Sequence, residues 1–329
     1  MTEETMKAMV ASAYGDADVL QLQQVHRPQI AADELLVKVM TSAATRADAM
    51  MLSGKPYFAR LFLGLTKPKS PIPGTGFAGL VEAVGSQVTK FRVGDRVFGE
   101  TTFGFSANAD YLKVAESGVV LPLPENLSFA NAANFCDGHL TSFNFLKEIA
   151  NVQIGQKVLI IGASGALGTS GVQIAKYLGA SVHGVCSSKN AGLVLSLGAE
   201  KVIDYKTEDY TKPTVQYDFI YDAVGKSSFR SCKPILKDNG VYLSPVLNLS
   251  LLLQMMISSI FGGKKAQFAA TGVNTDDKLR ALLTEVVNIF KEGRLKMVID
   301  RQYPLEKLAE AHRYIMTGRK KGNIVIHHT

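Results

Sequence analysis

The chain is poor in cysteine, and this shortage excludes whole classes of protein. Its 329 residues include only three cysteines, Cys136, Cys186 and Cys232, which lie far apart in the sequence. Neither a disulfide framework nor the paired-cysteine spacing of a structural zinc site can be built from them. Because this usage is typical of a reducing compartment, we expect a cytoplasmic protein.

Long apolar runs are also missing. The most apolar segment, residues 249–261, is about half as long as a membrane-spanning helix needs to be. The first ten residues, MTEETMKAMV, are polar and acidic and do not resemble a signal peptide. We therefore expect no membrane partner.

The charge is positive but dispersed. The formal net charge is +7, yet the densest basic groups, at residues 67–69, 264–265 and 319–321, are short. Scattered charge indicates a solvated surface and an anionic cofactor more than a nucleic-acid face. A nucleic-acid partner is therefore not expected.

The most informative segment is KVLIIGASGALG, residues 157–168. Its apolar run predicts a strand buried on both faces, and its glycines predict a tight turn with close backbone approach. The following residues, 169–178, have helical spacing. A helix that begins at such a turn points free N–H groups at an anion such as a diphosphate, which assigns the turn residues to a cofactor. These turn residues are Ser164, Gly165, Ala166 and Leu167.

The surrounding pattern divides the chain into two domains. Residues 6–13, 34–41, 79–84 and 96–98 are strand candidates without intervening helices, which predicts a barrel-like domain. After a helical pattern at 128–147, strands and helices alternate, which predicts a doubly wound parallel sheet, the Rossmann class of α/β fold. We expect one domain at 1–124 and 272–329, because the last segment resembles the first, and another at 125–271.

The end of the second strand of such a sheet sets cofactor specificity. A carboxylate there would bind a ribose diol and repel a 2′-phosphate. The chain has Ser187 and Lys189 instead, so we predict NADPH in preference to NADH. Tyr205, which ends the third strand, is expected beside the adenine or as a cap on the sheet. Val224 and Ser244, at later strand ends, are also assigned to the cofactor.

Five segments in the same order resemble one family, the zinc-free medium-chain dehydrogenase/reductases of the quinone oxidoreductase (zeta-crystallin-like) branch. The resemblance implies a GroES-like β-barrel domain plus a Rossmann domain, a homodimer, and a cofactor contact at Thr141. The segments are KAMVASAYGDADVLQL (7–22), PIPGTGFAGLVEAVGSQVTKFRVGDRVFG (71–99), residues 139–180, SLGAEKVIDYKTEDY (196–210) and residues 303–326.

The resemblance also implies what the site lacks. Zinc-dependent relatives have a cysteine ligand near residues 45–48 and a Gly-His-Glu where this chain has Gly74, Thr75 and Gly76. No thiolate, imidazole or carboxylate stands at Thr75 or Gly76, so we expect no zinc. Without a metal, the expected reaction is hydride transfer from NADPH to a quinone or an α,β-unsaturated carbonyl compound.

The catalytic candidates lie where the chain departs from the family. Thr45 replaces an asparagine that lies beside the nicotinamide in relatives, while Asp48 is retained. Asp137 and His139 stand where small and apolar residues are commoner. They are interpreted as a proton relay, as a buried structural pair or as part of an exposed turn. Tyr57 lies near a family tyrosine that contacts substrate, which makes it a candidate proton donor.

Several alternatives stay open. Residues 54–73 are either a lid or a short helix on the barrel, and residues 249–261 a core or dimer helix that also walls the substrate cleft. Together with Phe58, Leu61, Phe62 and Phe103 they indicate a small hydrophobic, electron-poor substrate. The other functions considered are an enoyl-thioester reductase and an NADPH-binding structural or RNA-binding protein.

Overall fold

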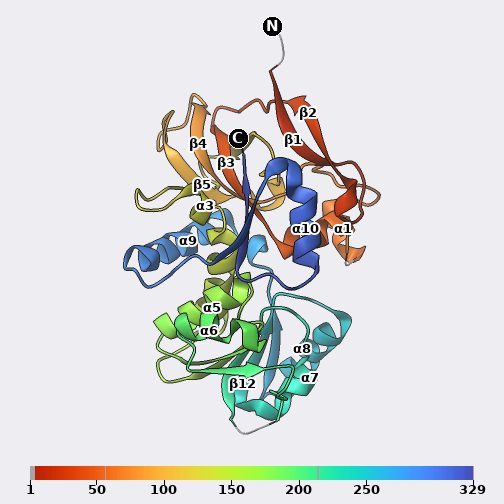
Figure 1. The fold of residues 1–329 in the computed structure, drawn as a ribbon, viewed down its shortest axis with the longest axis vertical. Coiled ribbons are helices and arrows are strands. Elements are labelled where there is room, and N and C mark those ends of the chain that lie inside the picture. Colours follow the sequence, from red (N-terminus) through yellow and green to blue (C-terminus); the bar gives the residue numbers. More distant parts are fainter. Residues whose placement is uncertain (1–3, 56, 213–214, 329) are drawn as a thin grey trace. The chain divides into compact units, whose positions relative to one another are not determined.

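In a computed structural model that describes residues 4–55, 57–212 and 215–328, the chain forms two compact units. The barrel unit comprises Met1–Asp137, Gly272–Thr284 and Ile299–Thr329, and the sheet unit comprises Gly138–Thr271 and Glu285–Val298. Figure 1 shows their elements. The predicted domain boundaries differ from these divisions and stay a prediction.

The barrel unit is built on mainly antiparallel β-sheet, in which only the pairing of β14 with β15 is parallel among the described strands. A two-stranded sheet pairs β1 with β2, and a larger sheet has the order β14–β15–β3–β4–β5–β7, with β6 also paired to β3. Strand β15 pairs antiparallel with β3, so residues 323–327 belong to the sheet that the N-terminal strands form, as expected. The strands are β1 (Thr5–Ala11), β2 (Leu20–His26), β3 (Glu34–Ala44), β4 (Gly76–Val84), β5 (Arg96–Glu100), β6 (Tyr111–Ala115), β7 (Val119–Pro122), β14 (Ile299–Pro304) and β15 (Asn323–His327).

Short helices surround this sheet. Helix α1 (Arg46–Ser53) follows β3 directly, and the predicted lid segment contains a 3-10 turn at Tyr57–Ala59 and helix α2 (Arg60–Leu63). The segment therefore contains a short helix, but none of the helix's residues is buried, and Leu61 and Phe62 on it are 67% and 71% exposed. The lid alternative stays a prediction. The side chain of Phe58 lies outside the described part of the chain. Helices α9 (Asp276–Lys291) and α10 (Leu308–Met316) follow later in the chain.

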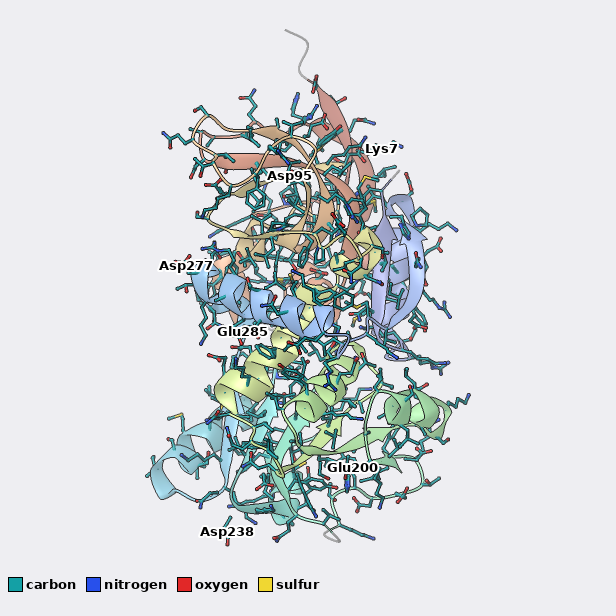
Figure 2. The ribbon with its side chains drawn as sticks, turned by 90° about the vertical axis from the view of Figure 1, so that its left-hand side faces the viewer. Lys7, Asp95, Glu200, Asp238, Asp277 and Glu285 are labelled. Atoms are coloured by element: carbon teal, nitrogen blue, oxygen red, sulfur yellow. The ribbon has the colours of Figure 1, made fainter. Side chains whose placement is uncertain are left out.

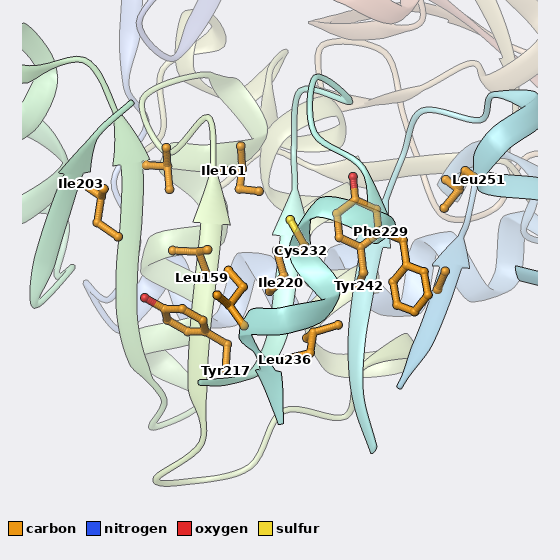
Figure 3. Packing of buried hydrophobic residues seen from close by; sticks show 13 residues of the cluster. Leu159, Ile161, Ile203, Tyr217, Ile220, Phe229, Cys232, Leu236, Tyr242 and Leu251 are labelled. Carbon is orange, nitrogen blue, oxygen red and sulfur yellow. The ribbon is translucent and has the colours of Figure 1, made fainter. Parts of the chain in front are cut away.

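The sheet unit contains the predicted doubly wound sheet. Its strands are all parallel and have the order β10–β9–β8–β11–β12–β13. Apolar residues of neighbouring strands, such as Leu159, Ile220 and Tyr242, pack with Phe229 and Leu251 into one buried cluster (Figure 3). The strands are β8 (Lys157–Ile161), β9 (Ser181–Cys186), β10 (Lys201–Asp204), β11 (Tyr217–Asp222), β12 (Leu236–Ser244) and β13 (Lys265–Phe268), and the helices α5 (Ala166–Tyr177), α6 (Ala191–Ser196), α7 (Phe229–Cys232) and α8 (Leu249–Phe261).

The helical pattern predicted at 128–147 is present but irregular. Ser128 caps α3 (Phe129–Ala132) by accepting a hydrogen bond from the Asn131 N–H at 3.3 Å. Two π-helical segments, Phe135–Leu140 and Asn144–Ile149, then flank α4 (Thr141–Phe143). Wide π turns of this kind often mark functional sites, and the segment contains three of the predicted site residues.

Helix α8 does not have the buried character that a core helix would have. Its largest exposed side chains recur at i, i+3, i+4, i+7, i+8 and i+11, so they form one stripe. Leu251 and Ser258, on the opposite side, are buried. The exposed stripe consists of Leu249, Leu252, Leu253, Met256, Ile257 and Ile260, each at least 42% exposed.

Candidate functional site

The predicted cofactor residues of the sheet unit gather at one edge of its sheet. Parallel strands present their carboxyl ends at the same edge, and a nucleotide binds where the strand order reverses, which here is between β8 and β11. Every strand from β8 to β12 ends beside a predicted contact. The residues that follow or end these strands are Ser164, Gly165, Ala166, Leu167, Ser187, Lys189, Tyr205, Val224 and Ser244.

Close packing of the turn after β8 explains two of its three glycines. Gly162 has φ +79°, and a Cβ there would lie 2.0 Å from Cγ2 of Val224. A Cβ on Gly168 would lie 2.1 Å from the carbonyl oxygen of Gly162. By contrast, a Cβ on Gly165 would meet only that same oxygen, at 3.5 Å. The fold itself therefore requires Gly162 and Gly168, whereas Gly165 leaves room above the turn for a ligand.

Helix α5 begins at this turn with Gly165 as its N-cap. Its first-turn N–H groups have no carbonyl partner within the helix, and together with the helix dipole they favour an anion. The Ser164 hydroxyl accepts a hydrogen bond from Nδ2 of Asn190 at 3.0 Å, which leaves its own proton free for a phosphate oxygen. Ser142 donates to the Leu167 carbonyl at 2.8 Å, which holds the neighbouring Thr141 beside the start of α5.

The end of β9 presents the predicted 2′-phosphate donors. Lys189 is exposed, and Ser187 is half-buried just before it. Asp204, at the end of β10, is a nearby carboxylate that the sequence reasoning did not consider. Its oxygens accept hydrogen bonds from the N–H groups of Ser188 and Lys206, both at 2.9 Å, and these bonds lower its pKa. Its charge is thus held by backbone donors, which leaves Ser187 and Lys189 free for an anion.

A single buried carboxylate organises the turn after β11. Asp222 accepts hydrogen bonds from the N–H groups of Val224, Gly225 and Ser227 at 3.1, 2.8 and 2.9 Å. The hydroxyl of Tyr242 donates to it at 2.7 Å. These four donors fix the backbone that places Val224 against Gly162. Sequence reasoning missed this residue, although an aspartate ending an apolar strand before a glycine turn was a usable signal.

In the barrel unit, Thr45 and Asp48 form a capping box at the start of α1. The Thr45 hydroxyl accepts a hydrogen bond from the Asp48 N–H at 3.0 Å and donates to Oδ2 of Asp48 at 2.8 Å. The Thr45 N–H donates to the same oxygen at 2.9 Å. Because the hydroxyl proton of Thr45 is already engaged, Asp48 is the member of this pair with spare hydrogen-bonding capacity.

Asp48 lines a pocket of about 130 Å³ in the barrel unit. The pocket backbone is strained on one side, since Phe105 has φ +52° and Ser106 has φ +75°. Tyr14 closes another side, with its hydroxyl donating to the Gly64 carbonyl at 2.6 Å. The other lining residues are mostly apolar: Ala11, Met51, Leu52, Phe62, Leu63, Pro68, Lys69, Ser70, Pro71, Pro73, Gly74 and Phe103.

Three acids of the barrel unit influence one another: Asp48, which is buried, and Glu100 and Asp137, which are half-buried. Burial raises the pKa of Asp48 to about 7, and the charge of Asp137 adds to this shift while the hydrogen bonds from Thr45 oppose it. Burial likewise raises the pKa of Glu100 to about 7, with Asp137 and Asp48 adding to it. Burial also raises the pKa of Asp137, against the attraction of Lys320. Asp48 and Glu100 therefore hold protons at higher pH than ordinary carboxyl groups do, and spacing along the sequence gave no sign of this.

The other catalytic candidates have separate surroundings. Burial lowers the pKa of His139 to about 4, against a hydrogen bond with the Lys296 backbone, so its ring is neutral at pH 7. Tyr57 is 67% exposed, with the Arg60 guanidinium 5.0 Å from its ring centroid. The roles proposed for both residues stay predictions, as does the relay between His139 and Asp137.

A GroES-like barrel unit and a Rossmann sheet in one chain are the architecture of nucleotide-dependent dehydrogenases and reductases. Residues 31–125 match the family described as alcohol dehydrogenase GroES-like domain, and residues 197–326 match the zinc-binding dehydrogenase family. The chain belongs to the medium-chain dehydrogenase/reductase superfamily, in its quinone oxidoreductase branch.

Individual relatives agree with this assignment. The chain is 30% identical to a 2-methylene-furan-3-one reductase of Solanum lycopersicum, over 98% of this chain and 79% of that protein. It is 29% identical to a chloroplastic NADPH-dependent alkenal/one oxidoreductase of Arabidopsis thaliana, with the same coverage. The structure of the quinone oxidoreductase from Coxiella burnetii is similar with a TM-score of 0.87, at 26% identity, over 98% of this chain and 99% of that chain.

The name zinc-binding dehydrogenase raises the question of metal ligands. Among residues 4–55, 57–212 and 215–328, no three His, Cys, Asp or Glu side chains are grouped so that they could hold a metal ion. No helix within this same part of the chain is long and apolar enough to cross a membrane. The cysteines Cys136, Cys186 and Cys232 are buried.

Proposed function

We propose that this protein is an NADPH-dependent oxidoreductase that reduces quinones or α,β-unsaturated carbonyl compounds without zinc. The observation that carries the proposal is the alignment of the glycine turn, Ser187 and Lys189 along the carboxyl edge of the Rossmann sheet. The names of the relatives, which include an alkenal/one and a quinone oxidoreductase, support the same reaction class.

The residues present fit NADPH. The first turn of α5 and the Ser164 hydroxyl would hold the diphosphate, and Ser187 with Lys189 would hold the 2′-phosphate. Tyr205, which is 55% exposed, would lie beside the adenine. Thr141, Val224 and Ser244 would contact the nicotinamide half. The space above Gly165 and the free proton of Ser164 are the features of this chain that suit a diphosphate.

When bound, NADPH supplies the hydride, so the chain's own residues have to position the substrate and exclude water. Polarising a conjugated carbonyl needs only a hydrogen-bond donor in a dry site. The candidate groups in the barrel unit are Thr45, Tyr57 and Asp137. The candidate in the sheet unit is His139, whose ring is neutral. The Thr45 hydroxyl would act through Asp48, to which it already donates.

The test is NADPH oxidation with a panel of quinones, enals and enones, with a crotonyl thioester included to separate an enoyl-thioester reductase. We expect turnover of at least one quinone or enone, and none above the enzyme-free control would contradict the proposal. A Ser187→Asp, Lys189→Ala double variant should shift preference toward NADH, because a carboxylate repels the 2′-phosphate. A Lys201→Ala variant, at the start of β10, is the matched control.

We further propose that the protein is a cytoplasmic homodimer. The exposed stripe of α8 and the unpaired side of β13, the last strand of its sheet, offer adjoining surfaces to a second copy, since α8 packs on β13. Light scattering should give twice the chain mass. An Ile257→Glu, Ile260→Glu variant should give a monomer, while Ser259→Glu, on the same helix but outside the stripe, should not. The small number of cysteines and their wide spacing in the sequence agree with a reducing compartment.

A nucleic-acid partner remains unexpected. Exposed side chains of both signs are scattered over both units, as the positions of Lys7, Glu200, Asp238 and Asp277 illustrate (Figure 2). Binding of single-stranded RNA that weakens steeply with salt would contradict this view.

A further inference from the structure

One surface of the barrel unit exposes apolar side chains together. Helix α2 ends before Gly64, and none of its residues is buried. Leu61, Phe62 and Leu65 are 67%, 71% and 68% exposed. Single exposed apolar side chains are ordinary in soluble proteins, but several side by side mark a surface that meets a partner or a membrane. We call these three side chains the α2 patch.

Contacts at the base of the α2 patch hold it outward. Nε of Arg60 donates a hydrogen bond to the Gly54 carbonyl oxygen at 3.0 Å, and the Arg60 guanidinium lies 4.4 Å from the centroid of the Tyr14 ring. The Tyr14 hydroxyl donates to the Gly64 carbonyl oxygen at 2.6 Å. Both ends of α2 are therefore fastened to the barrel unit, while the apolar side chains between and beyond them stay outside.

The charge around the α2 patch has one sign. From residue 49 to residue 81 the sequence contains Lys55, Arg60, Lys67 and Lys69 but neither aspartate nor glutamate. The three lysines are exposed, and within the described part of the chain their ammonium groups have no ion-pair partner. Lysines left unpaired in this way create a positive potential that attracts a negatively charged partner.

The combination of lysines and projecting apolar side chains favours a lipid surface over a protein. Lysine is depleted at protein–protein interfaces, whereas a bilayer with anionic headgroups attracts it. Apolar side chains can enter the headgroup region of such a bilayer while neighbouring ammonium groups stay at the level of the phosphates. Phe62 and Lys69 also line the pocket of about 130 Å³, so docking here would bring that pocket to the lipid surface.

We propose that the α2 patch, together with Lys55, Lys67 and Lys69, docks the protein on the surface of a bilayer that contains anionic lipids. The contact is peripheral, because only a few side chains enter the headgroup region and no helix of the described residues is long and apolar enough to cross the bilayer. The expectation of no membrane partner rested on the lack of a long apolar run, which a peripheral contact does not need. The inference is independent of NADPH and of the proposed reaction.

The test is co-sedimentation of the full chain with sucrose-loaded vesicles. One set of vesicles is made of phosphatidylcholine alone, and the other contains about 30% phosphatidylserine, which supplies the negative surface potential. A Leu61→Ser, Phe62→Ser variant removes most of the α2 patch and keeps the charge. A Lys67→Gln, Lys69→Gln variant removes two charges and keeps the α2 patch.

Matched controls change the same kinds of side chain elsewhere in the barrel unit. Val93→Ser removes an apolar side chain that is 63% exposed. A Lys38→Gln, Lys90→Gln variant removes two exposed charges, so its net charge equals that of the lysine variant under test. All these side chains are exposed, so every variant should keep the thermal midpoint of the wild type.

We expect the wild type to bind the anionic vesicles and not the neutral ones. Removing Lys67 and Lys69 should weaken binding about thirtyfold, because each lysine close to an anionic surface contributes about fivefold. The Leu61→Ser, Phe62→Ser variant should bind about tenfold more weakly, since less apolar surface leaves water. Raising the salt concentration from about 0.05 M to about 0.5 M should also weaken wild-type binding about tenfold.

Three results would overturn the inference. Equal sedimentation with both kinds of vesicle would mean that charge does not guide docking. Failure to sediment with the anionic vesicles would leave an acidic protein as the occupant of this surface. Binding by both test variants that equals that of the controls would place any lipid contact elsewhere on the molecule. None of these results bears on NADPH oxidation, which is measured without vesicles.

Discussion

The barrel unit and the sheet unit build their candidate sites from different materials. In the sheet unit, the candidate site is formed mainly by the backbone. A glycine turn, a helix N-terminus and the carboxyl ends of parallel strands define the edge at which a nucleotide would bind. In the barrel unit, side chains from α1, the 62–74 segment and the 103–105 segment converge on one buried carboxyl group. A site made of backbone needs the ligand to approach the main chain closely, so it tolerates few added side-chain atoms. The properties of the barrel pocket instead depend on whether single side chains are protonated.

The largest effect should come from the backbone site. Gly168→Ala places a Cβ 2.1 Å from the Gly162 carbonyl oxygen, so the turn has to move, and we expect a loss of about 3 kcal/mol in the free energy of unfolding. Urea denaturation measures it. Gly192→Ala, where nothing lies within 4 Å, should instead leave stability equal or slightly higher. An unharmed Gly168→Ala variant would show that the turn is not tightly packed.

The barrel site should respond to pH instead. The folded-state pKa of Asp48 is raised above its unfolded value of 3.8 to about 7, so its contribution to stability is present below pH 4 and lost as pH rises toward 7. Asp48→Asn removes this loss. Unfolding of both proteins at pH 5 and pH 8 should show the variant gaining about 2 kcal/mol relative to wild type at the higher pH.

Histidine titration does not disturb that comparison. Burial lowers the pKa of His139, His312 and His328 to about 4, so these residues cost stability as pH falls below about 6.5 in both proteins. The effect cancels in the difference between wild type and variant. A difference that stays constant between pH 5 and pH 8 would mean that Asp48 is ionised throughout.

The Asp222 carboxylate should control the backbone of the turn after β11. Asp222→Asn keeps the size of the side chain but replaces one accepting oxygen with an NH₂ group that faces backbone donors. We expect a loss of about 2 kcal/mol in unfolding free energy and weaker NADPH binding, measured by denaturation and calorimetry. Asp238→Asn, at an exposed position, should change neither.

The smallest effect should be at Asn190. Its Nδ2 orients the Ser164 hydroxyl, so Asn190→Ala should weaken NADPH binding about fivefold and leave the unfolding midpoint almost unchanged. Adenosine 2′,5′-bisphosphate, which carries the two phosphates of the adenosine half but no diphosphate, is the comparison ligand. The difference between its loss of affinity and that of NADPH tells whether the diphosphate contact is the one affected. Unaltered NADPH affinity would remove Ser164 from the diphosphate site.

The same contrast explains what the sequence could predict. The alternation of strands and helices after residue 147 was predictable, because short apolar runs determine strands such as β9 and β10 locally. The interacting acids were not predictable, because Asp48, Glu100 and Asp137 come together only when β5 and α1 are placed by the barrel.

Helix α8 shows the limit of apolar patterning. Its composition correctly predicted a helix, and the core alternative was wrong because one apolar face is left outside. Periodicity tells that a face is apolar, but it does not tell whether the same chain covers that face. Only the structure shows that Leu251 faces the core and Ile260 the solvent.

The α8 stripe has a further consequence for how the protein keeps its fold at low abundance. If a second copy covers these side chains, part of the free energy that maintains the native state comes from association and follows the law of mass action. The thermal midpoint then rises with protein concentration in the wild type and not in the Ile257→Glu, Ile260→Glu variant. Expression level in the cell would thereby set the working stability of the enzyme.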